Sequence, residues 1–338
     1  MIYWGSLNFN LLLKQIMSES SPKKGRVIQS TGKWYKVHLS DTGEIVQSRL
    51  PGKFRLRGMK QTNPIAVGDM VDVIIQDDES GLIDEIHDRF NKITRQATHG
   101  KKGEHILVSN VDQAFVVQAV DQPKFRTGFI DRFLVTCEAY DVKPKIILNK
   151  IDLGTDELAP EVAMVMDVYE GLGYQVILTS IFDQDSLEKL AMLIKDKVSV
   201  FIGPSGTGKT SILNHIEPEI ERPVAEVSKF SNKGRHTTTF AELLPLSIGG
   251  WIADTPGIRE FALVDFEPAE LSLYFPEMAE RREECKYYNC THLHEPGCAV
   301  MQAWNDGLIA ASRYDSYINM IETLDDDKGS AGSRKWGR

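Results

Sequence analysis

Residues 203–211 read GPSGTGKTS, and this stretch constrains the fold more than any other part of the chain. The apolar run 198–202 precedes it, and a segment of helical character, 211–216, follows it. Strand, glycine-rich loop and helix are the context of a phosphate-binding loop, because glycines let backbone N–H groups converge on an anion at a helix N-terminus. The pattern therefore predicts an α/β domain that binds a nucleotide.

Individual loop residues have distinct expected roles. Lys209 would contact the outer phosphates, and the Thr210 hydroxyl would bind the Mg²⁺ that accompanies the nucleotide. We expect the rest of the loop to line the same site. Its members are Gly203, Ser205, Gly206, Thr207, Gly208 and Ser211.

A second motif, NKID at 149–152, follows the apolar run 145–148 and predicts which base is bound. The Asp152 carboxylate can accept hydrogen bonds from N1–H and the exocyclic amine of guanine, a donor pair that adenine lacks. Asn149 would tie this motif to the phosphate-binding loop, and the aliphatic stem of Lys150 would cover one face of the base. Beside a phosphate-binding loop, this motif indicates guanine.

DTPG at 254–257 follows the apolar run 248–253 and is placed to sense the γ-phosphate. We expect Asp254 to hold Mg²⁺ through water and the Gly257 N–H to bond the γ-phosphate. Ile258 occupies the next position, where Ras-like enzymes place a water-orienting glutamine, and its side chain cannot form a hydrogen bond. We therefore predict slow intrinsic hydrolysis that needs a partner to order the attacking water.

GRHTTT at 234–239 and the pair Thr179-Ser180 are further candidates. We expect Thr238 to reach Mg²⁺ and the γ-phosphate, and His236 is a candidate to assist hydrolysis, with a surface histidine as the alternative. An ordinary Ser/Thr-rich loop would explain the segment if it stood alone. Thr179 and Ser180 follow a strand-like run and are candidates for the loop that touches the guanine O6 edge.

Three of the four cysteines lie close together in C-x₄-C-x-H-x₅-C: Cys285, Cys290 and Cys298, with His292 between them. Three thiolates and one imidazole make a closed tetrahedral zinc site of the structural kind, which leaves no position for a catalytic water. His294 is a competing ligand. The helical segment around the cluster is too small to fold reliably without such a metal.

The amino-terminal part, residues 23–90, reads as short strands with turn signals between several of them. Five strands in so short a stretch suit an OB-fold barrel, which binds single-stranded nucleic acid. The alternative, a barrel whose aromatics are core residues and whose loop charges are solvated, has equal weight from the pattern alone. The expected strands are 25–30, 34–39, 45–49, 70–75 and 82–87, and the candidate RNA contacts are Trp34, Lys53, Phe54, Arg55, Arg57 and Lys60.

Charge is unevenly distributed in this chain of 338 residues with a net charge of −9. Residues 22–105 hold 15 Lys and Arg against 11 Asp and Glu, whereas residues 106–338 hold 23 against 36. The amino-terminal module is therefore the part suited to phosphate backbones. No stretch approaches the roughly 20 apolar residues of a membrane span. We expect a cytoplasmic monomer without membrane contact.

The order of the motifs is itself informative, because the base-reading motif comes late in Ras-like GTPases but precedes the phosphate-binding loop here. This order predicts a circular permutation, which is tolerable because domain termini usually lie at the surface and often close together. With the cysteine–histidine cluster, NKID, GPSGTGKTS, GRHTTT and DTPG, the sequence resembles the RsgA (YjeQ) family of circularly permuted GTPases over about residues 23–320.

The resemblance implies a GTPase that binds the small ribosomal subunit in its late maturation, with activation by the subunit and release after hydrolysis. It implies an OB-fold that contacts ribosomal RNA, a doubly wound GTPase domain and a helical zinc-binding module, with His292 rather than His294 as the zinc ligand. Two departures are minor: Thr210 stands where many relatives carry Ser, and Ile181 replaces a small residue.

The expected domains are an extension without order at 1–22, the OB-fold at 23–90, a linker at 91–105, the GTPase domain at 106–265, the zinc-binding module at 266–325 and a disordered tail at 326–338. Two other functions fit the motifs less well. A P-loop ATPase or kinase would not need Asp152, and a structural RNA-binding factor would not need Lys209.

Overall fold

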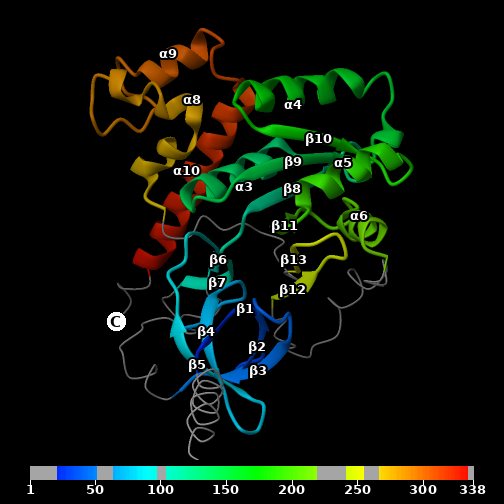
Figure 1. Ribbon diagram of the computed structural model, residues 1–338. Coiled ribbons are helices and arrows are strands. Elements are labelled where there is room, and N and C mark those ends of the chain that lie inside the picture. The colour runs from blue at the N-terminus through cyan, green and yellow to red at the C-terminus, as the bar shows by residue number, and fades with distance from the viewer. Residues whose placement is uncertain (1–20, 52–63, 97–103, 219–240, 255–265, 334–338) are drawn as a thin grey trace, which may run out of the picture. The chain divides into compact units, whose positions relative to one another are not determined.

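The computed structural model describes residues 21–51, 64–96, 104–218, 241–254 and 266–333 (Figure 1). The chain divides into two compact units. The first unit contains residues 1–111 with the short later segments 238–244 and 253–256, and the second contains residues 112–237, 245–252 and 257–338. None of the helices in the described part of the chain has the length and apolar character that a membrane crossing requires.

The first unit contains a closed five-stranded barrel. Alternating apolar residues form its strands, as in β2, where Tyr35, Val37 and Leu39 are buried. The strands follow the order β1-β2-β3-β5-β4, and β4 pairs back onto β1, which is the closed arrangement of an OB-fold. The strands are β1 (Lys23–Ser30), β2 (Trp34–Leu39), β3 (Ile45–Arg49), β4 (Met70–Ile75) and β5 (Gly81–Ile86).

A two-stranded antiparallel sheet, β6 (Lys92–Gln96) with β7 (Glu104–Ser109), follows the barrel in the first unit. We expected a linker over residues 91–105 and the first strand of the nucleotide domain at 106–108. Instead, residues 106–108 belong to β7 and pair with β6, because Ile93 and Val108 bury their side chains in this unit.

A buried carboxylate ties this hairpin to the barrel. Asp69 is fully buried, and both of its oxygens accept hydrogen bonds from Arg89, at 2.6 Å each. The Ser109 hydroxyl at the end of β7 donates to the same carboxylate at 2.5 Å. Another pairing that the sequence did not indicate joins β12 (Glu242–Pro245) to β1, where Glu242 pairs with Gln29.

A parallel sheet forms the centre of the second unit, in the order β10-β9-β8-β11. Every residue of β8 and β11 is buried, as expected for central strands covered on both faces. Beside β11, the Trp251 N–H at the start of β13 (Trp251–Asp254) donates to Lys197 O. The strands are β8 (Gln113–Ala119), β9 (Pro144–Asn149), β10 (Gln175–Thr179) and β11 (Val198–Ile202).

Helices connect these strands, so the sheet is of the doubly wound α/β type, in which ligands bind beyond the carboxyl ends of the strands. Phe115 and Val117 of β8 pack in one apolar cluster with residues of α5 and α6, including Leu190 and Ile212. The connecting helices are α3 (Thr127–Ala139), α4 (Ala159–Gly171), α5 (Gln184–Ile194) and α6 (Lys209–Ile216).

The C-terminal part of the second unit is a helical module that packs on α3. Its apolar core includes Val135 of α3, Phe275 and Tyr317. Figure 1 shows α10 running beside α3. The elements are the 3₁₀ helices η2 (Pro268–Tyr274) and η3 (Arg282–Glu284) with α8 (Pro276–Ala279), α9 (Ala299–Asn305) and α10 (Ala311–Ser333).

Helix α10 continues to Ser333, whereas the polar composition after residue 325 led us to expect a disordered tail. Helical hydrogen bonds are local, so a helix nucleated by the packed part of α10 can extend through a polar stretch that has no apolar face of its own.

A buried arginine joins this module to the sheet domain. Arg313 of α10 is fully buried, and it contacts Asp131 of α3 and Glu277 of α8, each at 2.7 Å. Tyr169 of α4 donates to the same Asp131 carboxylate at 2.7 Å, and the guanidinium lies 4.5 Å from the centre of the Phe275 ring. Burial alone would lower the pKa of Arg313, but the two carboxylates outweigh it and raise the pKa, so the guanidinium remains charged.

We predict that Arg313→Met destabilises the protein by about 3–5 kcal/mol, because it leaves two buried carboxylates without their cation. The urea midpoint of the full chain, followed by far-ultraviolet circular dichroism, measures this effect. Asp315→Asn is the matched control, because Asp315 lies on the same helix and is exposed. A midpoint for Arg313→Met no lower than that of the control would contradict the structural role of Arg313.

Candidate nucleotide site and metal centre

The glycines of 203–208 are required by close backbone packing at the end of β11. A Cβ on Gly203 would lie 2.1 Å from Val117 O, and one on Gly208 would lie 2.2 Å from Asn149 Nδ2. Gly206 and Gly208 also have positive φ angles, of 86° and 94°. The loop therefore lies directly against β8 and the end of β9, and α6 begins at Lys209, directly after the last glycine.

Lys209 bridges this loop from the inside. Its ammonium donates to Gly203 O at 2.8 Å and to Pro204 O at 2.6 Å, and the Thr207 hydroxyl donates to the same Pro204 O at 3.1 Å. Because Lys209 is also the first residue of α6, its charge adds to the positive end of the helix dipole. This is the electrostatic arrangement of an anion-binding loop.

Asn149 joins this loop to the strand ends on its other side. The side chain is 2% exposed; its Nδ2 donates to Thr207 O at 2.9 Å, and its Oδ1 accepts from the Thr179 hydroxyl at 2.9 Å. Thr179 is the last residue of β10. A single buried amide therefore fixes the end of β10 and the phosphate-binding loop with respect to the end of β9.

Asp152 lies exposed just beyond β9, and the direction of its carboxylate is fixed. The hydroxyl of the buried Ser180 donates to Asp152 Oδ1 at 2.5 Å. Lys150 has a positive φ of 61°, and its ammonium donates to Gln122 O in the loop after β8. The structure thus brings the base-reading motif, the Thr179-Ser180 pair and the phosphate-binding loop into one hydrogen-bonded cluster.

Other candidates fall outside what the structure describes. Thr238, His236 and Gly257 lie outside the described residues, and for Asp254 only the backbone, at the end of β13, is described. Among the RNA-contact candidates, Trp34 is 43% exposed at the start of β2. The remaining candidates, Lys53, Phe54, Arg55, Arg57 and Lys60, are also outside the described residues.

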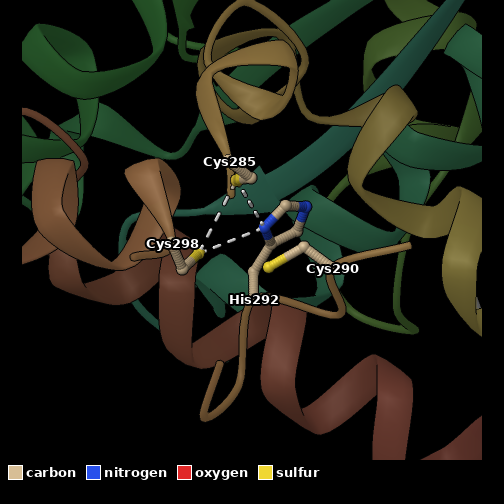
Figure 2. Close-up of side chains that lie close together, drawn as sticks. All are labelled: Cys285, Cys290, His292 and Cys298. Carbon is tan, nitrogen blue, oxygen red and sulfur yellow. Dashed lines mark hydrogen bonds between the residues drawn. The ribbon is translucent and has the colours of Figure 1, made fainter. Parts of the chain in front are cut away.

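Four side chains of the cysteine–histidine cluster lie close enough together to hold a metal ion (Figure 2). The ligand atoms of Cys285, Cys290, His292 and Cys298 all lie within 4.8 Å of one another. Sγ of Cys285 is 3.9 Å from Sγ of Cys298, and His292 Nδ1 is 3.6 Å and 3.3 Å from these two sulfurs. Tetrahedral zinc coordination places sulfurs roughly 3.8 Å apart and a sulfur roughly 3.6 Å from a nitrogen. The residues therefore fit a metal ion.

Burial sets the protonation of the ligands. It raises the pKa of the Cys290 thiol to about 12, raises that of Cys298, and lowers the pKa of the His292 imidazole. The imidazole is therefore neutral near pH 7 and can coordinate a metal ion. The thiols must lose their protons to solvent when they bind a cation. His294 is exposed and lies outside the cluster, so the structure places His292 there.

The surroundings hold the ligand loop in place. The Glu295 carboxylate accepts hydrogen bonds from the N–H and hydroxyl of Thr291 and from the Leu293 N–H. Although burial opposes ionisation, these bonds hold the pKa of Glu295 well below its usual range. From α10, Tyr314 donates to His292 O at 2.6 Å. The loop is therefore fixed from both sides.

Two family models match adjacent stretches of the chain. The RsgA N-terminal domain matches residues 24–83, and the RsgA GTPase matches residues 86–264. A Bacteroides fragilis protein named small ribosomal subunit biogenesis GTPase RsgA is 41% identical over 305 residues, which are 90% of this chain and 98% of that protein. A protein of the same name from Flavobacterium johnsoniae is 43% identical. The match covers 88% of this chain and 92% of that protein.

This chain belongs to the RsgA GTPase family. Solved structures agree with this assignment. YjeQ from Thermotoga maritima has a TM-score of 0.74 and is 33% identical. The match covers 90% of this chain and 98% of the YjeQ chain. YloQ, described as a circularly permuted GTPase, has a TM-score of 0.71 and is 34% identical. The match covers 90% of this chain and 96% of the YloQ chain. The chain is therefore a circularly permuted GTPase with an N-terminal OB-fold barrel, and its reaction is GTP hydrolysis.

Sequence reasoning selected Ser180 as a candidate for the loop at the guanine O6 edge, but it missed the hydrogen bond from Ser180 to Asp152. It also missed the Glu295 carboxylate, which holds the cluster loop. A glutamate between a histidine and a cysteine is too common in sequences to signal this role.

We predict that the purified protein carries one equivalent of a tightly bound metal, and that Cys298→Ser loses it. The Cys298 sulfur also accepts the Met301 N–H at 3.3 Å, so its removal loosens the start of α9 as well. Cys137→Ala is the control, because Cys137 is buried in α3 and lies outside the cluster. Elemental analysis of protein purified without chelators gives the result. Equal metal content in both variants would show that the cluster is not the metal site.

Proposed function

We propose that this chain is a GTPase that binds the small ribosomal subunit and acts in its late maturation, in the cytoplasm and as a monomer. The GTP-bound state binds the subunit, and hydrolysis releases it. The observation that carries this proposal is the buried amide of Asn149, which joins a guanine-type motif to a phosphate-binding loop. The relatives named as small-subunit biogenesis GTPases support the choice of partner.

In the proposed site, guanine lies edge-on to Asp152, which reads N1–H and the exocyclic amine. The Asn149 amide keeps that carboxylate at a fixed position relative to the loop that holds the phosphates. An adenine nucleotide would leave a fixed carboxylate without its donors, which is the basis of selection.

Hydrolysis then depends mainly on positioning and charge. Lys209 and the loop N–H groups offset the charge that develops on the transferred phosphoryl group. Thr210, Thr238 and, through water, Asp254 would hold Mg²⁺, which would supply further electrostatic stabilisation. The Gly257 N–H bonds the γ-phosphate. Ile258 offers no hydrogen bond to the attacking water, so the partner orders that water, with His236 as the candidate to help.

We further assign the cysteine–histidine cluster to one structural zinc ion. Three thiolates and one imidazole favour zinc, and the closed ligand set has no position for substrate. RNA contacts are assigned to the barrel of the first unit, whose charge balance is positive, through Trp34 and the loop that carries Lys53, Phe54, Arg55, Arg57 and Lys60.

The nucleotide state is coupled to the zinc-binding module through the chain itself. GTP orders residues 234–239 and 254–258, and the second of these segments leads directly into the module. The buried Arg313 joins the same module to α3, so a displacement at the start of the module is opposed by this ion pair. Tight subunit binding then requires GTP.

We predict that purified small ribosomal subunits raise the rate of GTP turnover at least about tenfold, because the partner completes the water-orienting machinery. Phosphate release is measured with and without small subunits. Large subunits serve as the matched control and leave the rate unchanged, and Lys209→Ala is inactive in every arm.

Sedimentation with small subunits tests the binding cycle in parallel. The protein co-sediments with a non-hydrolysable GTP analogue and separates from the subunit with GDP. Equal turnover with and without small subunits would refute activation by the subunit, and equal co-sedimentation in the two nucleotide states would refute release by hydrolysis.

A further inference from the structure

Phe182 is an exposed aromatic residue at the base-reading end of the site. Its side chain is 80% exposed. Single exposed apolar side chains are common, but this one lies in the loop that contacts the carboxylate of Asp152. The Ser180 hydroxyl that donates to Asp152 at 2.5 Å also accepts the Phe182 N–H, at 3.1 Å. One serine therefore links the Phe182 backbone to the carboxylate that reads guanine.

Asp152 lies between two different flanks. The strands follow the order β10-β9-β8. On the β8 side, the Lys150 ammonium reaches Gln122 O, so its aliphatic stem extends from the end of β9 toward the loop after β8. On the β10 side lie Ser180 and Phe182. A base that meets Asp152 edge-on therefore has the lysine stem on one side and the Phe182 loop on the other.

The backbone of the Phe182 loop is held in place, whereas its ring remains exposed. The Asp183 N–H donates to Ser180 O at 3.0 Å and closes the turn. The Asp183 side chain in turn caps α5 by accepting from the Ser186 N–H at 3.4 Å. The loop is thus ordered before ligand binds, which reduces the entropy lost when the ring is covered.

We propose that Phe182 forms the second wall of the guanine slot and stacks on the base face opposite the Lys150 stem. This inference rests on the proposed role of Asp152. Every purine has a π-face, whereas only guanine has the donor pair that Asp152 accepts. The two residues therefore have different roles: Phe182 contributes affinity for any purine base, and Asp152 distinguishes guanine from the other bases.

Dissociation constants for GDP and inosine diphosphate separate these two contributions, because inosine lacks the exocyclic amine. Phe182→Ala weakens both nucleotides about tenfold, as expected for the loss of one stacking contact, and leaves their ratio unchanged. Phe182→Tyr restores wild-type affinity. Asp152→Asn instead removes the preference for GDP over inosine diphosphate. Met192→Ala, at an apolar position of α5 that is 71% exposed, is the control and binds as the wild type does.

Phe182→Trp gives a second reading that does not depend on an affinity change. Stacking on guanine quenches the added indole, so GDP lowers the fluorescence of this variant by a larger fraction than that of the parent, which contains five tryptophans. Unchanged affinity in Phe182→Ala, or no additional quenching in Phe182→Trp, overturns the proposal if Asp152→Asn still loses GDP. Wild-type GDP binding in Asp152→Asn would overturn the proposed guanine site together with this inference.

Discussion

Two hydrogen bonds of the buried Asn149 amide hold the candidate nucleotide site together. They connect the end of β9 to Thr179 on β10 and to Thr207 in the phosphate-binding loop. All three segments end or begin at the carboxyl edge of a parallel sheet, where doubly wound folds bind ligands. Because the amide is buried, each bond left unmade would cost about 1–3 kcal/mol. The circular permutation leaves this junction intact, since it changes only the order in which the segments occur in the chain.

Buried charges join the other parts in the same way. Asp69 pairs with Arg89 and bonds the β6–β7 hairpin to the barrel through Ser109, and Arg313 ties the helical module to α3 through Asp131. Such pairs contribute less net stability than apolar packing, but they fix one geometry, because a displaced partner is left buried and unpaired.

Local patterns predicted much of the fold and most of the candidate site. Alternation in the sequence located the five barrel strands to within about two residues, and the cysteine–histidine spacing predicted the four side chains that cluster within 4.8 Å of one another. What sequence could not predict depends on long-range contacts. Residues 106–108 have the pattern of a sheet strand, yet they pair with β6, and Glu242 pairs with Gln29 far away in sequence. The contacts of Ser180 with Asp152 and of Arg313 with Asp131 have no sequence signal, because these partners are 28 and 182 residues away.

A crystal structure with a non-hydrolysable GTP analogue would show whether the two motifs bind one nucleotide. We expect one nucleotide whose guanine edge bonds to Asp152 and whose phosphates lie on residues 203–210, with the Asn149 amide still bound to Thr207 and Thr179. A nucleotide that touches only one of the two motifs, or an Asn149 side chain that releases both partners on binding, would contradict it.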